Sequence, residues 1–269
     1  MSRLGPLIAK SAVSETYHWG DRQTLKLYRP GAPPDAAARE AAHARLAHEA
    51  GIPTPAVIEE ITHDGRAGIV FERVDGPSML EMLGQRPETV EALARQFALL
   101  HADLHGRAGT GLPGQRERLR RRIANNYAIT AGVRAAALAS LDPLPDGETL
   151  CHGDFHPGNI ILARHGPIIL DWFDATAGVP AADLCRTLLL LRFSVLPRAL
   201  PAAVRGGIDG VRASFAATYL QQYTAHRPVP SAEVDAWGLS VAVARLTELV
   251  SMPEHTAIAA FIQGLLSHP

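Results

Sequence analysis

The spacing of apolar residues changes once along the chain, and this change limits the folds that it can adopt. Up to Phe71, short runs rich in β-branched and aromatic residues recur between Gly-Asp, Pro-Gly and Asp-Gly turn signals, over residues 16–19, 24–28, 57–61 and 68–71. One stretch of helical character interrupts them, from about Asp35 to Ala50, where Gly51 ends it. This order predicts a small antiparallel sheet with one inserted helix.

After Phe71 the spacing becomes mostly helical, as in Val90, Leu93, Ala94, Phe97, Leu100 and Leu104. A short β-type interlude, over 150–152, 159–162 and 168–171, lies inside this helical half. The Gly76-Pro77 pair marks the transition between the two halves. We therefore expect an α+β protein with an N-lobe over 1–73, a hinge over 74–78 and a helical C-lobe over 79–269.

Composition excludes several classes of protein. Hydrophobic residues make up 47% and charged residues 20%, which is ordinary for a globular chain. A formal net charge of -1 argues against a broad basic surface for nucleic acid. The apolar stretch from Leu184 to Leu196 contains two arginines and is too short to cross a bilayer, so we expect a buried helix there.

Two cysteines, Cys151 and Cys185, fall short of a disulfide framework, and no export signal is visible at the N-terminus. A reducing compartment fits these features best. We expect a cytoplasmic protein with neither a nucleic-acid nor a membrane partner.

The segment His152-x-Asp154-x4-Asn159 has the spacing of a kinase catalytic loop, in which the Asp accepts the proton of the acceptor hydroxyl and the Asn binds a metal ion. Asp171 ends the apolar run 168–170, so a strand would bring its carboxylate to the same loop end as Asn159. Hard oxygen ligands of this kind suit Mg²⁺.

Lys26 lies in a predicted strand, on the face opposite Leu25 and Leu27, where a rigidly held cation can bind phosphates. A His-x-Asp-x4-Asn match alone arises by chance on the order of once per hundred chains of this length. The order of features makes it specific: a strand Lys, an acidic helix, the Asp-x4-Asn loop and a strand-ending Asp.

With these residues, the sequence resembles the aminoglycoside phosphotransferases and their choline-kinase-like relatives, from about Leu7 to Leu191. The closest similarity lies in residues 151–159, 169–172 and 180–184. The family has a bilobal protein-kinase-like fold, with a small antiparallel β N-lobe that carries one helix and a larger, mainly helical C-lobe. The resemblance therefore implies an ATP-dependent kinase that acts on a small-molecule hydroxyl.

The resemblance also implies roles for single residues: Asp154 as catalytic base, Asn159 and Asp171 as Mg²⁺ ligands, Lys26 on the nucleotide phosphates, Glu40 as the partner of Lys26, and the backbone from Glu72 to Val74 around the adenine. Spacing alone does not exclude Glu49 in place of Glu40. The implied cofactors are ATP, or GTP, with Mg²⁺, and the implied partner is a small hydroxylated substrate. The oligomeric state stays unknown.

Two departures from the family pattern keep an alternative open. The loop over 10–16, which would cover the phosphates, has no glycine, and residues 178–180 read Gly-Val-Pro where relatives often have Gly-Asp-Pro. A nucleotide-binding pseudokinase or regulatory module without turnover is the alternative. A zinc hydrolase built on Cys151, His152, Asp154 and His156 is a third reading, which the loop signal at Pro157 disfavours.

Four other polar residues receive structural interpretations. We expect His101 and His105 to pack at a helix end, His152 to shape its loop through backbone bonds, and Asp183 to support the catalytic loop. After Asp183 the chain has five acidic residues and seven arginines. Because aminoglycosides are polycations, this balance disfavours an antibiotic substrate.

Overall fold

The computed structural model describes residues 4–196, 201–248 and 251–267. Its contacts divide the chain into two compact units, Met1–Ser78 with Asn159–Asp174, and Met79–Gly158 with Ala175–Pro269. The lobes expected over 1–73 and 79–269, and the hinge expected over 74–78, stay a prediction.

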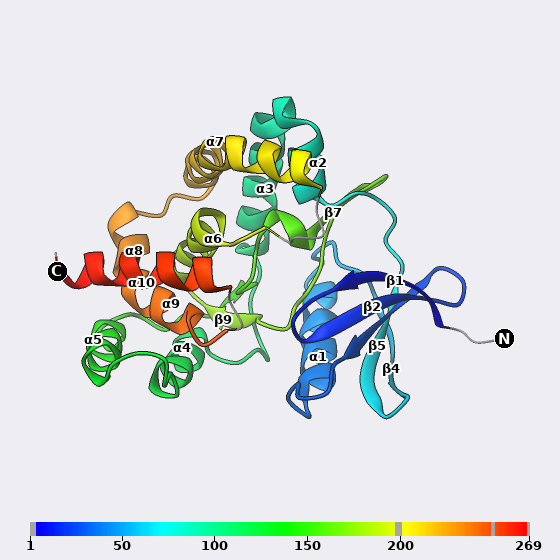
Figure 1. The fold of residues 1–269 in the computed structure, drawn as a ribbon, viewed down its shortest axis with the longest axis horizontal. Helices are drawn as coiled ribbons and strands as arrows, with labels where there is room; N and C mark the ends of the chain where they lie inside the picture. The colour runs from blue at the N-terminus through cyan, green and yellow to red at the C-terminus, as the bar shows by residue number, and fades with distance from the viewer. Residues whose placement is uncertain (1–3, 197–200, 249–250, 268–269) are drawn as a thin grey trace. The chain divides into compact units, whose positions relative to one another are not determined.

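The first unit is built on a five-stranded sheet of order β1-β2-β3-β5-β4, in which all neighbours are antiparallel (Figure 1). The strands are β1 (Leu4–Lys10), β2 (Ser14–Trp19), β3 (Gln23–Tyr28), β4 (Val57–His63) and β5 (Arg66–Glu72). The four predicted runs fall within β2 to β5. Strand β1 was not predicted, because it is a largely exposed edge strand whose sequence contains Gly5 and Pro6.

Helix α1 (Ala36–Glu49) covers one face of this sheet, within one residue of each predicted end. Its buried face is mostly alanine, which lets the helix approach closely, and Ala37 and Ala41 pack with Tyr28 and Ile69. On the opposite face, Leu25, Leu27, Trp19 and Val70 form a second cluster. This alternation places even-numbered residues of β3, Lys26 among them, on the side of α1.

A hairpin of β7 (Ile160–Ala163) and β8 (Gly166–Ile169) completes the first unit. The Ile169 N–H donates to the carbonyl of Pro53 at 2.8 Å, and the Leu162 N–H donates to that of Pro77 at 2.9 Å. The hairpin is thereby fixed to the segments that follow α1 and β5.

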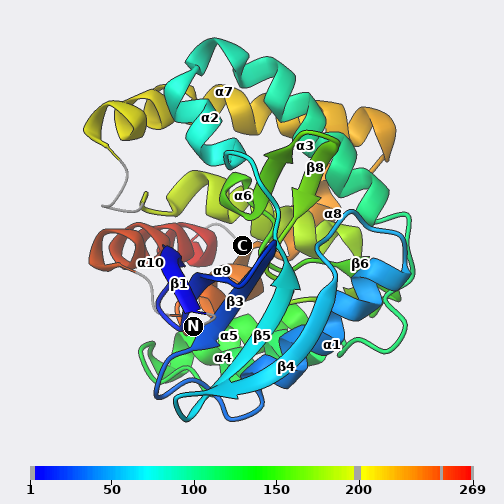
Figure 2. The same ribbon diagram turned by 90° about the vertical axis from the view of Figure 1, so that its right-hand side faces the viewer.

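The second unit is mainly helical (Figure 2). Its helices are α2 (Met79–Gln85), α3 (Val90–Leu104), α4 (Gln115–Ala124), α5 (Ala131–Leu141), α6 (Pro180–Phe193), α7 (Ala202–His226), α8 (Ser231–Ala236), α9 (Gly238–Arg245) and α10 (Met252–Ser267), with a 3₁₀ turn at Pro87–Thr89. A two-stranded ribbon joins β6 (Thr149–Cys151) to β9 (Thr176–Gly178), and a further 3₁₀ turn, Pro157–Asn159, spans the boundary of the two units.

Helix α3 packs along α7, and α4 and α5 pack against α9. Most residues of α6 are buried, as expected for the apolar stretch from Leu184 to Leu196, but the helix begins earlier, at Pro180, and ends at Phe193. No helix within the described ranges has the length and apolar character that a membrane span requires. Strands followed mostly by helices confirm the expected α+β class.

Candidate active site

The Lys26 ammonium pairs with two carboxylates of the first unit. Its Nζ atom lies 2.7 Å from Glu40 Oε1 on α1 and 3.1 Å from Asp171 Oδ1, just beyond β8. The side chains of Lys26 and Glu40 are only 12% and 2% exposed. Glu49, by contrast, is exposed at the end of α1, so the carboxylate that pairs with Lys26 is Glu40.

Tyr28 is the second partner of Glu40. It lies two residues after Lys26, on the same face of β3, and its hydroxyl donates to Glu40 Oε2. Burial raises the pKa of Glu40, and the Lys26 ammonium opposes this rise. Although burial lowers the pKa of Lys26, the carboxylates of Asp171 and Glu40 outweigh it and raise the pKa, so the amine stays charged. Tyr28 was not predicted from the sequence, although its position on the same strand face as Lys26 indicates a place beside it.

Asp171 occupies a strained backbone position. Its φ angle is 65°, in the left-handed region that non-glycine residues rarely adopt and that is enriched at functional sites. The neighbouring Trp172 is buried, and its Nε1–H donates to Thr54 Oγ1 at 2.8 Å, while its carbonyl lies 3.0 Å from His43 Nδ1. These anchors, which the sequence analysis did not find, hold the chain that carries Asp171.

Asn159 lies beside Asp171 at the end of the β7–β8 hairpin. The Leu170 N–H donates to the Asn159 carbonyl at 2.8 Å, so the hairpin brings the two residues to one loop end, as the strand pattern predicted. Their side chains offer carboxylate and amide oxygens, and the Asp171 side chain is 38% exposed. This donor set fits a hard cation such as Mg²⁺.

The second unit holds the loop of Asp154, and Asp183 on α6 binds the backbone of that loop. The Asp183 carboxylate is fully buried and accepts the backbone N–H of His152 at 2.7 Å and that of Gly153 at 2.9 Å. Gly153 has a φ of 77°, where a side chain would add strain. The His152 ring also shapes the loop, because its Nδ1 accepts the Asp154 N–H at 3.2 Å.

His101 on α3 and His105, which directly follows α3, complete the shell of Asp183. His101 Nε2 and His105 Nε2 lie 3.1 and 3.2 Å from Asp183 Oδ2. Their Nδ1 atoms lie 2.7 and 2.6 Å from the hydroxyls of Tyr219 and Tyr223 on α7. Burial lowers the pKa of His101 to about 3, so its ring is neutral, its Nε2–H donates to Asp183 and its Nδ1 accepts from Tyr219.

These hydrogen bonds hold the pKa of Asp183 well below its ordinary value, even though burial opposes them. Among the described residues, His101, His105 and Asp183 form the only group of three or more with metal-ligand geometry. Since the ring nitrogens already serve hydrogen bonds, the group is structural. Cys151, His152, Asp154 and His156 do not form such a group, so the geometry gives no support to the zinc reading.

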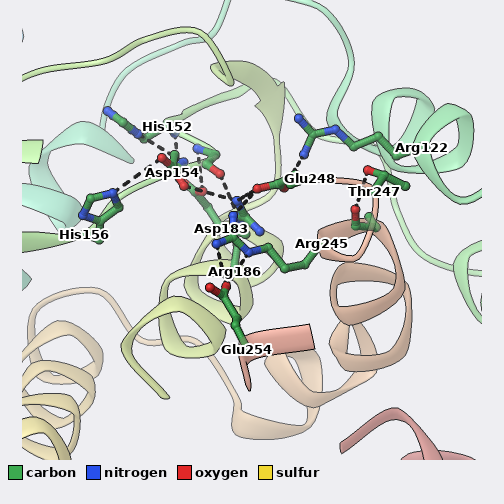
Figure 3. Close-up of polar contacts among 12 residues, drawn as sticks. Arg122, His152, Asp154, His156, Asp183, Arg186, Arg245, Thr247, Glu248 and Glu254 are labelled. Carbon is green, nitrogen blue, oxygen red and sulfur yellow. Dashed lines mark hydrogen bonds and ion pairs between the residues drawn. The ribbon is translucent and has the colours of Figure 1, made fainter. Parts of the chain in front are cut away.

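Asp154 itself faces three basic side chains (Figure 3). Arg186 on α6 donates to Asp154 Oδ1 at 3.2 Å, and His156 Nε2 lies 3.6 Å from Oδ2. Burial raises the pKa of Asp154, but His156, Arg186 and His152 outweigh it and hold the pKa well below its ordinary value. Arg186 was not predicted from the sequence, although it lies three residues after Asp183 on the same helix, where both can face one loop.

The two remaining predicted positions lie at the end of the sheet. Glu72 ends β5, its N–H donates to the Ala56 carbonyl at 3.0 Å, and Val74 follows two residues later. Their contact with adenine stays a prediction. In the glycine-free turn between β1 and β2, Ser11 Oγ accepts the N–H groups of Val13 at 3.2 Å and Ser14 at 3.0 Å.

The model of the phosphotransferase enzyme family matches residues 7–230. The chain belongs to this family. Membership confirms the resemblance stated above and the expected enzyme class, a kinase that transfers a phosphoryl group to an alcohol. No curated protein matches the sequence of this phosphotransferase.

Solved structures of aminoglycoside phosphotransferases share the fold of this phosphotransferase. A thermostable mutant of APH(4)-Ia has a TM-score of 0.64 at 14% identity, covering 98% of this chain and 91% of its own. An aminoglycoside-3'-phosphotransferase of type VIII has a TM-score of 0.61 at 20% sequence identity, and the match covers 89% of this chain and 93% of that enzyme. Choline kinase from Cryptosporidium parvum Iowa II has a TM-score of 0.56 at 12% sequence identity, and the match covers 98% of this chain and 90% of the choline kinase. These similarities confirm the kinase-like α+β fold.

Proposed function

We propose that this chain is an ATP-dependent kinase that transfers the γ-phosphoryl group to a hydroxyl of a small molecule, with Asp154 as the base. The observation that carries the proposal is the pairing of one strand lysine, Lys26, with both Glu40 and Asp171. A lysine that is buried between two carboxylates stays charged and fixed, which suits a group that binds nucleotide phosphates. A lysine of an ordinary sheet surface would be solvated.

The roles of the remaining residues follow from the chemistry of their side chains and backbone groups. Asn159 and Asp171 would hold Mg²⁺, which neutralises charge on the transferring phosphates when it is bound. Asp154 stays ionised, because the basic groups around it hold its pKa low, and it can therefore orient the acceptor hydroxyl and accept its proton. Backbone groups from Glu72 to Val74 would meet the base of the nucleotide.

ATP is the favoured nucleotide, with GTP as the alternative. The solved relative APH(4)-Ia was crystallised as a ternary complex with AMP-PNP, an ATP analogue, and hygromycin B. The relatives thus include enzymes for aminoglycosides and, in the Cryptosporidium protein, a choline kinase. The shared requirement is a small molecule with a hydroxyl group.

The charges of the second unit favour an acceptor that is not a polycation. Glu248 and Glu254, two of the five acidic residues after Asp183, are each bound by arginine: Glu248 by Arg122, Arg186 and Arg245, and Glu254 by Arg245. Carboxylates that are already paired bind an incoming ammonium group less strongly. We therefore expect a neutral or acidic hydroxylated metabolite rather than an aminoglycoside.

A specific observation favours a second candidate function, a nucleotide-binding pseudokinase. The N–H groups of Val13 and Ser14 are bound by Ser11 Oγ, so this turn offers a phosphate fewer donors than a glycine-rich loop does. In that case nucleotide would bind and regulate the protein without phosphoryl transfer.

One screen distinguishes the two functions. Wild-type protein with Mg²⁺ and either ATP or GTP is incubated with hydroxylated metabolites, choline and aminoglycosides, and ADP or GDP release and phosphorylated product are measured by coupled assay and mass spectrometry. Nucleotide affinity is measured in parallel by calorimetry. We expect a phosphorylated product whose formation falls by roughly three orders of magnitude in Asp154→Asn, with nearly unchanged nucleotide affinity.

Nucleotide binding without any product from the panel would favour the pseudokinase. A large loss of nucleotide affinity in Asp154→Asn would instead mean that the role of this residue is misassigned.

A further inference from the structure

A chain of ion pairs joins the end of α9 to Asp154 (Figure 3). Arg186 lies at the centre of this chain. Its Nη2 atom is 3.2 Å from Asp154 Oδ1 and 2.9 Å from Glu248 Oε2, and its Nε–H donates to the carbonyl of Gly153 at 3.1 Å. The Arg186 side chain is 8% exposed. The guanidinium therefore binds both the backbone and the carboxylate of the loop while a second carboxylate holds it.

Glu248 is itself held from two helices. Arg122 on α4 lies 2.8 Å from Glu248 Oε1, and Arg245 on α9 donates to Oε2. Arg245 in turn pairs with Glu254 on α10 at 2.6 Å. Three arginines and three carboxylates, Asp154 included, thus form one connected set with balanced formal charge. In such a set each group restrains the next, which stiffens it more than isolated surface pairs would.

The geometry of Arg186 is specific for arginine. Its planar fork makes three contacts in different directions, whereas a lysine ammonium at the end of a flexible chain acts as a single point charge. The other basic groups that face Asp154, His156 and His152, come from the loop itself. Arg186 differs from them because its charge is permanent and because it is anchored to a helix outside the loop.

We infer that Arg186 is a positioning residue, which fixes the orientation of the Asp154 carboxylate, and that Glu248 holds Arg186 in place for this task. The inference rests on the proposed role of Asp154 as base. Glu248, far along the chain from the catalytic loop, thereby belongs to the apparatus that sets the base. Since the base must meet the acceptor hydroxyl with correct geometry, small displacements reduce turnover strongly.

The test compares four variants: Arg186→Gln, Arg186→Lys, Glu248→Gln and the control Arg120→Gln. Arg120 also lies on α4 and pairs with a carboxylate, Asp142, at 2.7 Å, but this pair is partly exposed and lies outside the set that reaches Asp154. Melting temperatures and circular dichroism establish that each variant is folded. The kinetic constants are measured with ATP and the acceptor found in the screen.

We expect kcat of Arg186→Gln to fall roughly ten- to a hundredfold, with KM for ATP within about twofold of wild type. Arg186→Lys should recover only part of this loss, because one ammonium group cannot replace three directed contacts. Glu248→Gln should lower kcat less than Arg186→Gln does, and Arg120→Gln should match wild type. Wild-type kcat in Arg186→Gln, or full recovery by lysine, would overturn the inference.

A second readout needs no turnover. In protein with ¹³C-labelled aspartate carboxyls, the Asp154 resonance is identified by its loss in Asp154→Asn, and its protonation is followed as the pH is lowered. Removing the positive charge of Arg186 should let Asp154 take up its proton at a higher pH in Arg186→Gln. Glu248→Gln should produce no such upward shift, because it removes a negative charge and leaves the arginine.

This readout separates the two hypotheses. An upward shift in Arg186→Gln together with an inactive wild-type protein would refute the proposed function while the contact between Arg186 and Asp154 stands. An unchanged titration in Arg186→Gln would overturn the inference about Arg186 whatever the activity of the protein.

Discussion

The fully buried carboxylate of Asp183 accepts the backbone N–H of His152 at 2.7 Å, although the two residues are 31 positions apart in the chain. Together with Gly153, His101 and His105, this gives one carboxylate four hydrogen-bond donors. The loop that carries Asp154 therefore depends on a group that never faces the reaction.

Replacing Asp183 by asparagine should destabilise the protein, because the amide NH₂ group cannot accept from the donors that face it. We expect the free energy of unfolding to fall by about 3 kcal/mol or more, as for other buried groups that lose their partners. Urea unfolding at neutral pH measures this loss. Asp209→Asn is the control, since Asp209 is 65% exposed and pairs with Arg212 at 3.4 Å, and its effect should stay within about 0.5 kcal/mol.

The stability of the protein should fall as the pH is lowered from about 6.5 towards 3. In the unfolded chain, His101 takes up a proton at its ordinary pKa of 6.5. In the folded protein, burial lowers the pKa of His101 to about 3, so the ring stays neutral over most of this range. The unfolded state therefore binds more protons, and this group alone removes about 1.4 kcal/mol per pH unit over most of the window. Asp183, whose pKa is also lowered in the folded state, adds a further loss only below its ordinary value of 3.8.

Denaturant unfolding of wild type and His101→Gln at pH 7 and pH 4.5 measures this dependence. Glutamine cannot protonate, so the variant should be less stable than wild type at pH 7 but should lose less stability on acidification. Equal pH dependence in the two proteins would show that His101 is not the group responsible.

Removing the positive charge of Lys26 should weaken catalysis far more than removing any nearby surface charge. We expect Lys26→Met to lower kcat/KM for ATP by roughly 10²–10³-fold, the usual cost of losing one group that stabilises developing charge. Glu40→Gln should lower it less, since the lysine remains. Glu49→Gln, nine residues further along α1 and exposed, should behave as wild type; a loss there equal to that of Glu40→Gln would contradict the assignment of Glu40.

Tyr28→Phe tests whether Glu40 needs its second partner. The change removes only the hydroxyl that donates to Glu40 Oε2, so the buried carboxylate loses a hydrogen bond without loss of packing. We expect the free energy of unfolding to fall by roughly 1.5–3 kcal/mol and KM for ATP to rise several-fold. Tyr17→Phe is a matched control. Tyr17 lies on β2, the strand next to that of Tyr28, and its hydroxyl also donates to a glutamate, Glu15 on the same strand, at 3.0 Å. An equal rise in KM in both variants would argue against a specific role of Tyr28.

Activity should require a divalent cation and depend on Asp171. Chelation by EDTA should abolish transfer, and added Mg²⁺ should restore it. In Asp171→Asn, the Mg²⁺ concentration for half-maximal rate should rise by about tenfold or more, because a neutral amide replaces a charged ligand. Asparagine is the suitable substitution, since it tolerates the φ of 65° at this position better than alanine does. An unchanged Mg²⁺ dependence would exclude Asp171 as a ligand.

The sequence by itself determined most of the strands and helices and the kinds of side chain at the site. Turn signals and alternating apolar residues located β2 to β5, and Gly51 located the end of α1, because these features act locally through backbone geometry. The loop over 152–159 and Asp171, two residues beyond β8, were likewise predicted from the spacing of residues in the sequence. Even the choice of Glu40 over Glu49 had a signal, since Glu40 is three and four residues from Ala37 and Ala44 on the buried face of α1.

The tertiary structure alone decided which distant side chains meet. Thr54, which accepts from Trp172, and Glu248, which holds Arg186, carry no local pattern that marks them. Tyr28 and Arg186 share a strand face with Lys26 and a helix with Asp183, but that alone does not name Glu40 and Asp154 as their partners. A buried polar group is defined by the partners that compensate its burial. Those partners come from segments up to 145 residues apart, as the pair of Lys26 and Asp171 illustrates. Local sequence specifies strands, helices and turns, whereas the compensation of buried charge depends on the packing of the whole unit.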